Sequence, residues 1–481
     1  MQYLPLDHPT TTSLELFSEP GVEPKRLGFD ALNNWIRRYA SKLHDSGLQR
    51  GDRVGLYLSN SAELIVALFG NHLLGLITVP INPKTPAEEF RYVAEKSDLS
   101  ALISAADSPV PLKLALRPQE LGELPQADDE IPENKDPDVP ALLCFTSGTT
   151  ARPKGVILTH TNLRSNLRDL IEVWRWSHQD RLLLALPLFH VHGLVLGLHG
   201  WALTGCSLVL TSKFDPVQVL DLLSRRRCTL FMGVPTMYHR LLACPKCKSE
   251  NFASLRLAIS GSAPMSVELH ERCKKTIGQP VLERYGLTET IMNTSNPFEK
   301  RKPGSVGLPL PSVNIRLLDE RLVELKQPNQ IGEVCVQGPN VFSGYWKDTE
   351  ATRQAFSEGW FRTGDVGYRD EEGFYHLLGR LGLDMIKSGG YRIGAREIEE
   401  VLLRHPAVQE AAVVGLPDVD LGEKVVAFVV ADEGTTEAEL QTYCEEFLAS
   451  FKRPRAFSFL DSLPRNAMGK ITKSELKQLV V

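Results

Sequence analysis

The pattern of apolar and polar positions predicts alternating helices and strands over roughly the first 280 residues. Between residues 27 and 48, apolar side chains recur at helical spacing, and Gly47 ends the segment. Short apolar runs predict buried strands at 53–58, 78–81, 182–186, 207–211, 229–233 and 255–260. Helices are predicted at 62–74, 162–173 and 266–276. This alternation is typical of parallel sheets covered on both faces.

The pattern changes twice after residue 313. Predicted strands at 313–318, 333–337 and 374–378 lie among turns. From Gly379 a compact α+β unit follows, with helices at 395–404 and 436–450 and strands at 408–415 and 424–431. Prolines and acids in 107–139 predict a surface excursion. We therefore predict a multidomain α/β protein: a large N-terminal domain of layered sheets with helices (1–379) and a small α+β domain (380–481).

Composition limits the function classes. The 481 residues are 42% hydrophobic and 23% charged, which is typical of a globular protein with more than one domain. A net charge of −5 and a pI near 6.2 argue against nucleic acid as the main partner. No stretch approaches the roughly 18 apolar residues of a membrane span, and the N-terminus does not resemble a signal peptide. Eight dispersed cysteines favour reduced thiols and a cytoplasmic location. Cys244 and Cys247 form a CPKC pair without the second pair that a zinc site needs.

The loop Phe145–Gly155, FTSGTTARPKG, lies between two predicted strands. Glycines let the backbone approach an anion, hydroxyls and N–H groups donate hydrogen bonds, and a lysine neutralises charge, so the loop could wrap polyphosphate. It is not a Walker loop, because Lys154 is followed by Gly155 rather than by Ser or Thr opening a helix. The alternative is a polar surface turn.

Further short motifs are weak when taken singly. Tyr285–Glu289 (YGLTE) follows a predicted strand at 280–284, and Gly359–Asp365 (GWFRTGD) places an acid in a glycine turn. Gly379-Arg380 lies at the domain change, and Gly469-Lys470 lies in the tail. Each has an ordinary interpretation: a strand end, a β-turn aspartate or a solvated tail lysine.

Together, in this order and at these separations, the motifs resemble the adenylate-forming acyl-CoA synthetase family from about Leu27 to Lys473. The resemblance implies a large N-terminal domain with a small, mobile C-terminal lid. It also implies that a carboxylate attacks the α-phosphorus of Mg·ATP, giving acyl-AMP and pyrophosphate, and that CoA takes the acyl group after the lid rotates. Adenylation supplies a good leaving group, so such catalysis rests on positioning and charge neutralisation.

The resemblance also implies the site residues. The β- and γ-phosphates would be held by Thr146, Ser147, Gly148, Thr149, Thr150 and Lys154. The adenine would be framed by Gly261, Ser262, Ala263, Pro264 and Tyr285, with Gly286 beside them. Thr288 and Glu289 would serve phosphate and Mg²⁺, and Asp365 would take the ribose hydroxyls beside Arg380. Lys470 would bridge acyl carboxylate and phosphate in the first half-reaction, and Ser388, Gly389 and Gly390 would lie along the pantetheine path.

Two departures from the family pattern stand out. Ala151 occupies a loop position that is often glycine. Gly379–Asp384 reads GRLGLD, so the hinge residue is either Gly382 or Asp384.

The resemblance also implies that His190 would border the acyl site. His190 and His192 could instead suggest a metal pair, but no third ligand is evident.

The class of carboxylic acid that the protein activates is predicted mainly from Arg284. The segments 282–295, 189–193 and 232–236 resemble malonyl-CoA and methylmalonyl-CoA synthetases. A cation beside the acyl site is costly to bury unpaired, and a second substrate carboxylate would pair with its guanidinium. The alternatives are that Arg284 pairs with a protein acid such as Glu283 or points to solvent.

Other functions stay open at this point. The runner-up substrate is a medium- or long-chain fatty acid, and the acyl acceptor could be a carrier protein instead of CoA. A nucleotide-binding protein without activity is disfavoured by Lys154, Glu289, Asp365 and Lys470. The chain could act as a monomer or as a homodimer.

Overall fold

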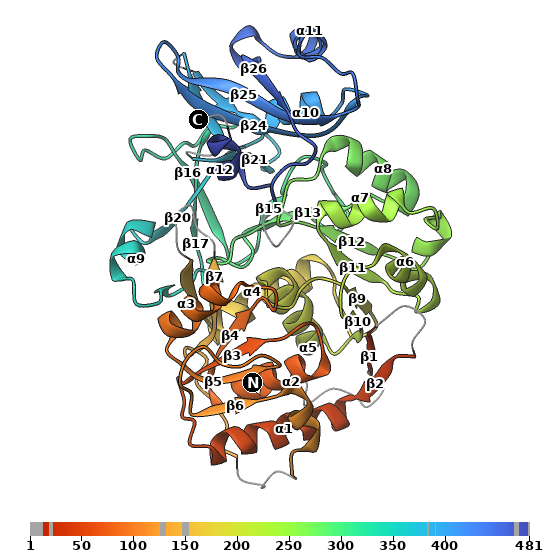
Figure 1. Cartoon of the computed structure of the whole chain (residues 1–481), viewed down its shortest axis with the longest axis vertical. Coiled ribbons are helices and arrows are strands. Elements are labelled where there is room, and N and C mark those ends of the chain that lie inside the picture. The colour runs from red at the N-terminus through yellow and green to blue at the C-terminus, as the bar shows by residue number, and fades with distance from the viewer. Residues whose placement is uncertain are drawn as a thin grey trace.

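The computed structural model describes residues 13–18, 23–125, 131–146, 153–381, 384–389, 391–465 and 471–479. Two large sheets and the helices around them fill the lower part of Figure 1, and the last hundred residues form a smaller unit above them. A smaller antiparallel sheet lies between these parts along the chain. The layered α/β class predicted from the sequence is confirmed.

The first large sheet has seven strands in the order β18-β8-β7-β4-β3-β5-β6. Their bounds are Gly344–Tyr345, Lys154–Thr159, Pro140–Thr146, Ile77–Ile81, Arg53–Tyr57, Leu99–Ser104 and Leu114–Leu116. The strands β4, β3, β5 and β6 pair in parallel, whereas β7 and β8 form an antiparallel hairpin. The hairpin confirms that the Thr/Gly-rich loop connects two strands, because Thr146 lies opposite Lys154.

The second large sheet has nine strands in the order β15-β14-β13-β12-β11-β9-β10-β1-β2. Their bounds are Leu308–Pro309, Thr294–Ser295, Leu282–Tyr285, Leu257–Ser260, Leu230–Gly233, Arg181–Leu184, Ser207–Thr211, Ser13–Phe17 and Lys25–Gly28. Successive side chains of β9 point to opposite faces of this sheet and enter different hydrophobic cores. Leu182 and Leu184 belong to the core between the two large sheets, and Leu183 belongs to the core on the outer face.

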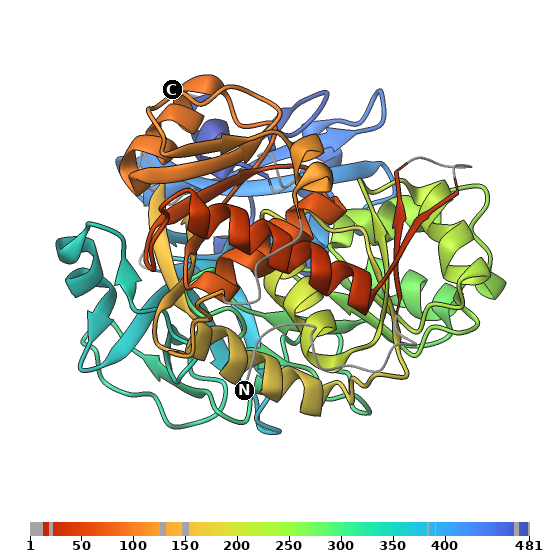
Figure 2. The same ribbon diagram turned by 90° about the horizontal axis from the view of Figure 1, so that it is seen from below.

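Helices cover both faces of the two sheets. One core joins the sheets through α1 (Phe29–Asp45), α2 (Ala62–Leu74), α4 (His160–Val173) and the π-helix η3 (His192–His199). The outer faces are covered by α3 (Ala87–Ser97), α6 (Pro216–Arg225), α7 (Pro235–Ala243) and α8 (Val267–Ile277). Figure 2 shows α1 crossing the lower face of the molecule. Buried all round, α2 begins at the Ser61 cap and ends at Gly75, whose φ is +70°.

A third sheet follows the large ones along the chain, in the order β16-β17-β20-β19, with β21 also paired to β20. The bounds are Asn314–Leu318, Gly332–Gln337, Trp360–Arg369, Phe356–Ser357 and Tyr375–Arg380. The prediction of a glycine turn at Asp365 was wrong, since this residue lies inside β20. Gly364 nevertheless has a φ of +71°, and both neighbouring ladders shift register nearby, so the strand is locally kinked.

The C-terminal unit has the sheet order β23-β22-β25-β24, with β26 paired to β25. The strands are Tyr391–Gly394, Met385–Ser388, Gly422–Ala431, Val408–Asp418 and Ala456–Phe459, and the helices are α10 (Ala395–Leu402), α11 (Glu437–Phe447) and α12 (Lys473–Gln478). Helices α10 and α11 cover one face and α12 the other. Arg396 on α10 donates to the Leu377 carbonyl of β21 at 3.2 Å, which ties this unit to the third sheet. The division at 379/380 stays a prediction; residue 380 ends β21.

The sequence pattern missed several elements. Among them are α3, α6, α7, η3, α12, the short helices α5 (Gly200–Thr204) and α9 (Thr349–Ala355), the 3₁₀ turns Ser249–Phe252 and Ser450–Lys452, and strands such as β1, β5 and β26. The predicted excursion at 107–139 contains β6 and a 3₁₀ turn at Pro118–Glu123. No helix in the described ranges is both long and apolar enough to cross a membrane.

Candidate active site

Strand β13 and the loop after it organise the site. Successive side chains of a strand point to opposite faces, so Arg284 projects away from Glu283 and Tyr285. A Cβ on Gly286 would lie 2.1 Å from the Ile291 carbonyl oxygen, so only glycine fits there. Ile291 itself has a φ of +56°, which is strained for a β-branched residue. The loop that carries Thr288 and Glu289 is therefore held in a costly conformation.

Asp365 joins two other predicted nucleotide ligands. Its carboxylate accepts a hydrogen bond of 2.6 Å from the Tyr285 hydroxyl and one of 2.9 Å from Arg380 Nε. Burial and the neighbouring Asp365 raise the pKa of Tyr285, so its hydroxyl remains a donor. A carboxylate has about four lone-pair sites. The two contacts orient Asp365 and leave acceptor capacity for hydroxyl groups.

Lys154 and Glu289 meet at a residue that the sequence analysis missed. Tyr345 in β18 donates to Glu289 Oε1 at 3.0 Å, and Lys154 Nζ lies 5.1 Å from the centroid of its ring. Burial, followed by Glu289, raises the pKa of this tyrosine. The aromatic pair after Gly344 was the available signal, but residue 345 lies 56 positions from Glu289.

Several predicted phosphate and lid residues cannot be placed. Ser147, Gly148, Thr149, Thr150, Gly390 and Lys470 lie outside the described residues, as do Ala151 and Gly382. Thr146 ends β7, so it enters the loop from the same hairpin as Lys154.

The surroundings of Glu289 fit a cation that also binds phosphate. Across the described ranges, no group of three or more His, Cys, Asp or Glu side chains is placed to hold a metal ion. Mg²⁺ keeps several waters and often binds through one or two carboxylates together with substrate phosphates. A single carboxylate near Lys154 matches that mode.

Arg284 is a buried cation that pairs with no acid among the described residues. Only 6% of the residue is exposed, and its Nε and Nη2 atoms have no hydrogen-bond partner among the described residues. Burial lowers its pKa to about 9. Glu283 accepts instead from the Gly304 N–H at 3.0 Å, and burial raises the pKa of this carboxyl to about 7. Pairing of Arg284 with Glu283 and exposure of Arg284 to solvent are therefore both wrong, and no other acid pairs with it among the described residues.

Gly261 and His192 lie beside Arg284, and Ser262 and His190 lie next to His192. A Cβ on Gly261 would lie 2.4 Å from Arg284 Cζ, so the guanidinium packs directly on this backbone. The next residue, Ser262, places its Oγ 3.3 Å from His192 Nδ1. His190 and His192 each bury an Nε2 atom that has no partner in the described part of the chain. Part of the stretch predicted to frame adenine thus also contacts the predicted acyl site.

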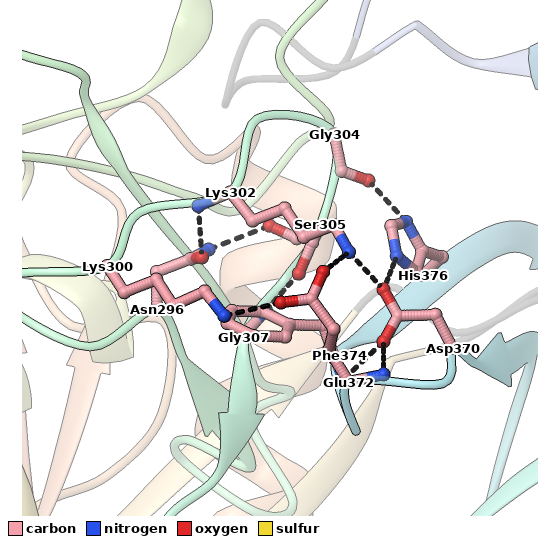
Figure 3. Close-up of polar contacts among 10 residues, drawn as sticks. All are labelled: Asn296, Lys300, Lys302, Gly304, Ser305, Gly307, Asp370, Glu372, Phe374 and His376. Carbon is pink, nitrogen blue, oxygen red and sulfur yellow. Dashed lines mark hydrogen bonds and ion pairs between the residues drawn. The ribbon is translucent and has the colours of Figure 1, made fainter.

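A polar network joins the loop at 296–307 to residues 370–376 (Figure 3), and Gly304 of this loop donates to Glu283 of β13. Lys302 bridges Asp370 and Glu372 at 2.7 and 2.8 Å, and His376 lies between Asp370 Oδ2 and the Gly304 carbonyl. Burial would raise the pKa of Asp370, but hydrogen bonds from Lys302 and His376 lower it overall. The β20–β21 turn is thereby fastened to the loop that supports Glu283.

The remaining predicted residues lie elsewhere. Ala263 and Pro264 follow Ser262 in the loop before α8. Ser388 ends β22 and is buried, and Gly389 has a φ of +57°; among the described residues, no hydrogen bond or ion pair joins either residue to the clusters above. At the candidate hinge, Asp384 accepts from the Arg380 N–H at 3.0 Å and from Lys473 Nζ at 2.5 Å.

Comparison with known proteins identifies the family. Residues 7–346 match the AMP-binding enzyme model, and residues 397–470 match the AMP-binding enzyme C-terminal domain. A malonate–CoA ligase of Arabidopsis thaliana is 36% identical over 486 residues, covering 91% of this chain and 79% of the relative. A long-chain-fatty-acid–CoA ligase of Bacillus subtilis (strain 168) is 33% identical over 506 residues, covering 94% and 90%. ATP-bound MatB from Rhodopseudomonas palustris has a TM-score of 0.92 and 36% identity, covering 100% of this chain and 99% of that one. As the resemblance of its motifs predicted, the chain belongs to the AMP-binding enzyme family.

Proposed function

We propose that the chain is an AMP-forming acyl-CoA ligase that activates a malonate-type dicarboxylic acid. The observation that carries the choice of acid is the buried guanidinium of Arg284, whose Nε and Nη2 atoms have no partner in the described part of the chain. An unpaired buried charge is strongly unfavourable, and a carboxylate that accepts two hydrogen bonds removes that cost. The malonate–CoA ligase relative supports this choice.

In the first half-reaction, one substrate carboxylate attacks the α-phosphorus of ATP and pyrophosphate leaves. Lys154 neutralises charge on the leaving phosphates, with Thr146, Ser147, Gly148, Thr149 and Thr150 as further donors. Asp365, oriented by Tyr285 and Arg380, holds the ribose. Glu289, with Thr288 beside it, would hold Mg²⁺, which when bound neutralises phosphate charge. Lys470 bridges the acyl carboxylate and the phosphate.

In the second half-reaction, the CoA thiol attacks the acyl carbonyl and AMP leaves. Ser388, Gly389 and Gly390 lie along the pantetheine path once the C-terminal unit has rotated. Asp384 is the better candidate for the hinge, because it bonds both to Arg380 of β21 and to Lys473 of the C-terminal unit. The domain division at 379/380, a cytoplasmic location and a monomeric or homodimeric state stay predictions, as does CoA rather than a carrier protein as acceptor.

A fatty acid is the second candidate substrate. The Bacillus subtilis relative supports it. An alkyl chain, however, offers no acceptor to Arg284 Nε and Nη2, so the buried cation would stay unpaired in the complex. His190 and His192, which lie near this cation, add polar atoms to the same region.

Pyrophosphate release tests the proposal directly. The purified chain is assayed with malonate, methylmalonate, propionate and octanoate, each with and without CoA. We expect malonate or methylmalonate to give the highest kcat/KM, with thioester formed only when CoA is present. Turnover of octanoate without turnover of either dicarboxylate would show that the assignment of Arg284 is wrong.

A further inference from the structure

We infer that His192 is a specificity-determining residue that donates a second hydrogen bond to the distal carboxylate of the acid, and that Ser262 positions it by fixing its tautomer. This inference rests on the proposed function, since it concerns the carboxylate that Arg284 would bind. In the sequence, His192 is distinguished only as one member of a His-x-His pair.

The surroundings of His192 are asymmetric. It begins the π-helix η3, an uncommon geometry that is frequent at functional sites, and only 6% of the residue is exposed. Its Nδ1 atom lies 3.3 Å from Ser262 Oγ. Its Nε2 atom is buried and has no hydrogen-bond partner in the part of the chain that the structure describes. One ring nitrogen is thus held by the protein, and the other is left for a ligand.

His192 and Arg284 contact neighbouring residues of one segment. Gly261 packs against the guanidinium, and Ser262 reaches the imidazole. Ser262 has a φ of +66°, a left-handed conformation that is unfavourable for a residue other than glycine. This strained turn places the Ser262 hydroxyl against His192 immediately after the backbone that supports Arg284.

The charge state of the imidazole favours a single donor. Burial, then Arg284 and His190, lower the pKa of His192, so the ring is neutral at pH 7. A neutral imidazole has one donor and one acceptor nitrogen. If Ser262 donates to Nδ1, the proton lies on Nε2. The unpartnered atoms, Arg284 Nε and Nη2 and His192 Nε2, are then all donors, which is the set that an acceptor-only carboxylate completes.

This arrangement would discriminate against monocarboxylic acids. A methyl group in place of the distal carboxylate leaves the buried Nε2–H without an acceptor, and a site built to hydrogen-bond a substrate rejects an analogue that lacks the partner. One hydrogen bond to a charged group is worth about 1.5–3 kcal/mol, which corresponds to a preference of roughly tenfold to a hundredfold.

Three variants separate this role from packing. In His192→Gln the side-chain amide reaches the place of Nε2, in His192→Asn it reaches only the place of Nδ1, and His192→Leu has no donor. We expect Leu and Asn to lower kcat/KM for malonate by roughly thirtyfold and to change propionate by less than about threefold. The His192→Gln variant should keep a kcat/KM for malonate within about fivefold of the wild-type value. Equal losses for both acids in His192→Leu, or a Gln variant as weak as Asn, would overturn the inference.

A spectroscopic readout is independent of turnover. In protein labelled with ¹⁵N-histidine, the His192 resonances are assigned by comparison with His192→Gln among the 12 histidines. We expect Nδ1 to be unprotonated and Nε2 protonated, and Ser262→Ala to mix the two tautomers. A protonated Nδ1 in the wild type contradicts the tautomer assignment. If the wild type activates neither malonate nor methylmalonate, the proposed function fails; if it does so and His192→Leu keeps the malonate-to-propionate ratio, only this inference fails.

Discussion

Arg284 and Lys473 are both largely buried cations, but their surroundings differ. Lys473 Nζ lies 2.5 Å from Asp384 and 2.6 Å from Glu399, and although burial alone would lower its pKa, these carboxylates raise it overall. Arg284 has no such partner in the part of the chain that the structure describes, and burial lowers its pKa to about 9. One charge is neutralised by the fold, whereas the other would be neutralised by a ligand. The difference separates a cation that stabilises the protein from one that serves binding.

The largest expected effect is on activity, at Arg284. Arg284→Met should lower kcat/KM for malonate by about a thousandfold, because losing one partner of a buried hydrogen-bonded charge pair costs about 2–5 kcal/mol. The same change should raise the free energy of unfolding by about 2 kcal/mol, because it removes an unpaired buried charge. Pyrophosphate release and urea unfolding measure the two quantities. Arg284→Lys keeps the charge but loses the planar guanidinium, so its kcat/KM for malonate should lie between those of the wild type and the Met variant. A Met variant that is less stable than the wild type and still uses malonate would show that Arg284, like Lys473, stabilises the fold and does not serve substrate binding.

The next effect is on stability, at Lys473. Lys473→Met should lower the unfolding free energy by about 3 kcal/mol, since it removes a largely buried cation that pairs with both Asp384 and Glu399. Differential scanning calorimetry of the full chain gives the change. Lys452→Met is the matched control, because Lys452 pairs with the half-exposed Glu397 and should contribute about 0.5 kcal/mol or less. Equal destabilisation by the two variants would contradict the role assigned to Lys473.

Glu283 tests the comparison with a buried anion. Burial raises its folded-state pKa from the usual 4.5 to about 7. Between these two pH values, the folded state therefore holds a proton that the unfolded state has lost. The stabilisation from this group is complete below pH 4.5 and is lost as the pH rises through 7. Raising the pH from 5 to 8 should therefore cost the wild type about 2 kcal/mol more than Glu283→Gln. Urea unfolding at both pH values measures this difference, and parallel pH profiles would show that Glu283 is ionised throughout.

The smallest expected effect comes from Gly261. Gly261→Ala places a Cβ 2.4 Å from Arg284 Cζ. The long arginine side chain is flexible, so its guanidinium can move aside at little cost in stability. We expect about a tenfold loss in kcat/KM for malonate and an unfolding free energy within about 0.5 kcal/mol of the wild type. Propionate kinetics serve as the control, because that acid makes no use of Arg284. A parallel loss for propionate would place the effect on ATP binding instead.

Local sequence signals predicted much of this molecule. The largely apolar run at 62–74 and the paired runs around FTSGTTARPKG identified α2 and the β7–β8 hairpin, because burial and turn chemistry act over short separations. Tyr345, Lys473 and Ser262 were not given their observed contacts, since these join residues 56, 89 and 70 positions apart. Asp365 was placed in a turn because a kinked strand and a turn both contain glycine with positive φ.

Asp384 has a thermodynamic consequence beyond its place at the candidate hinge. It bonds through its backbone and its side chain to Arg380, and Arg380 in turn holds Asp365. It also accepts from the Ala395 N–H at the start of α10. Whatever shifts the C-terminal unit thus acts on the carboxylate assigned to the ribose. Because linkage is reciprocal, a nucleotide that binds one orientation more tightly must favour that orientation by the same free energy.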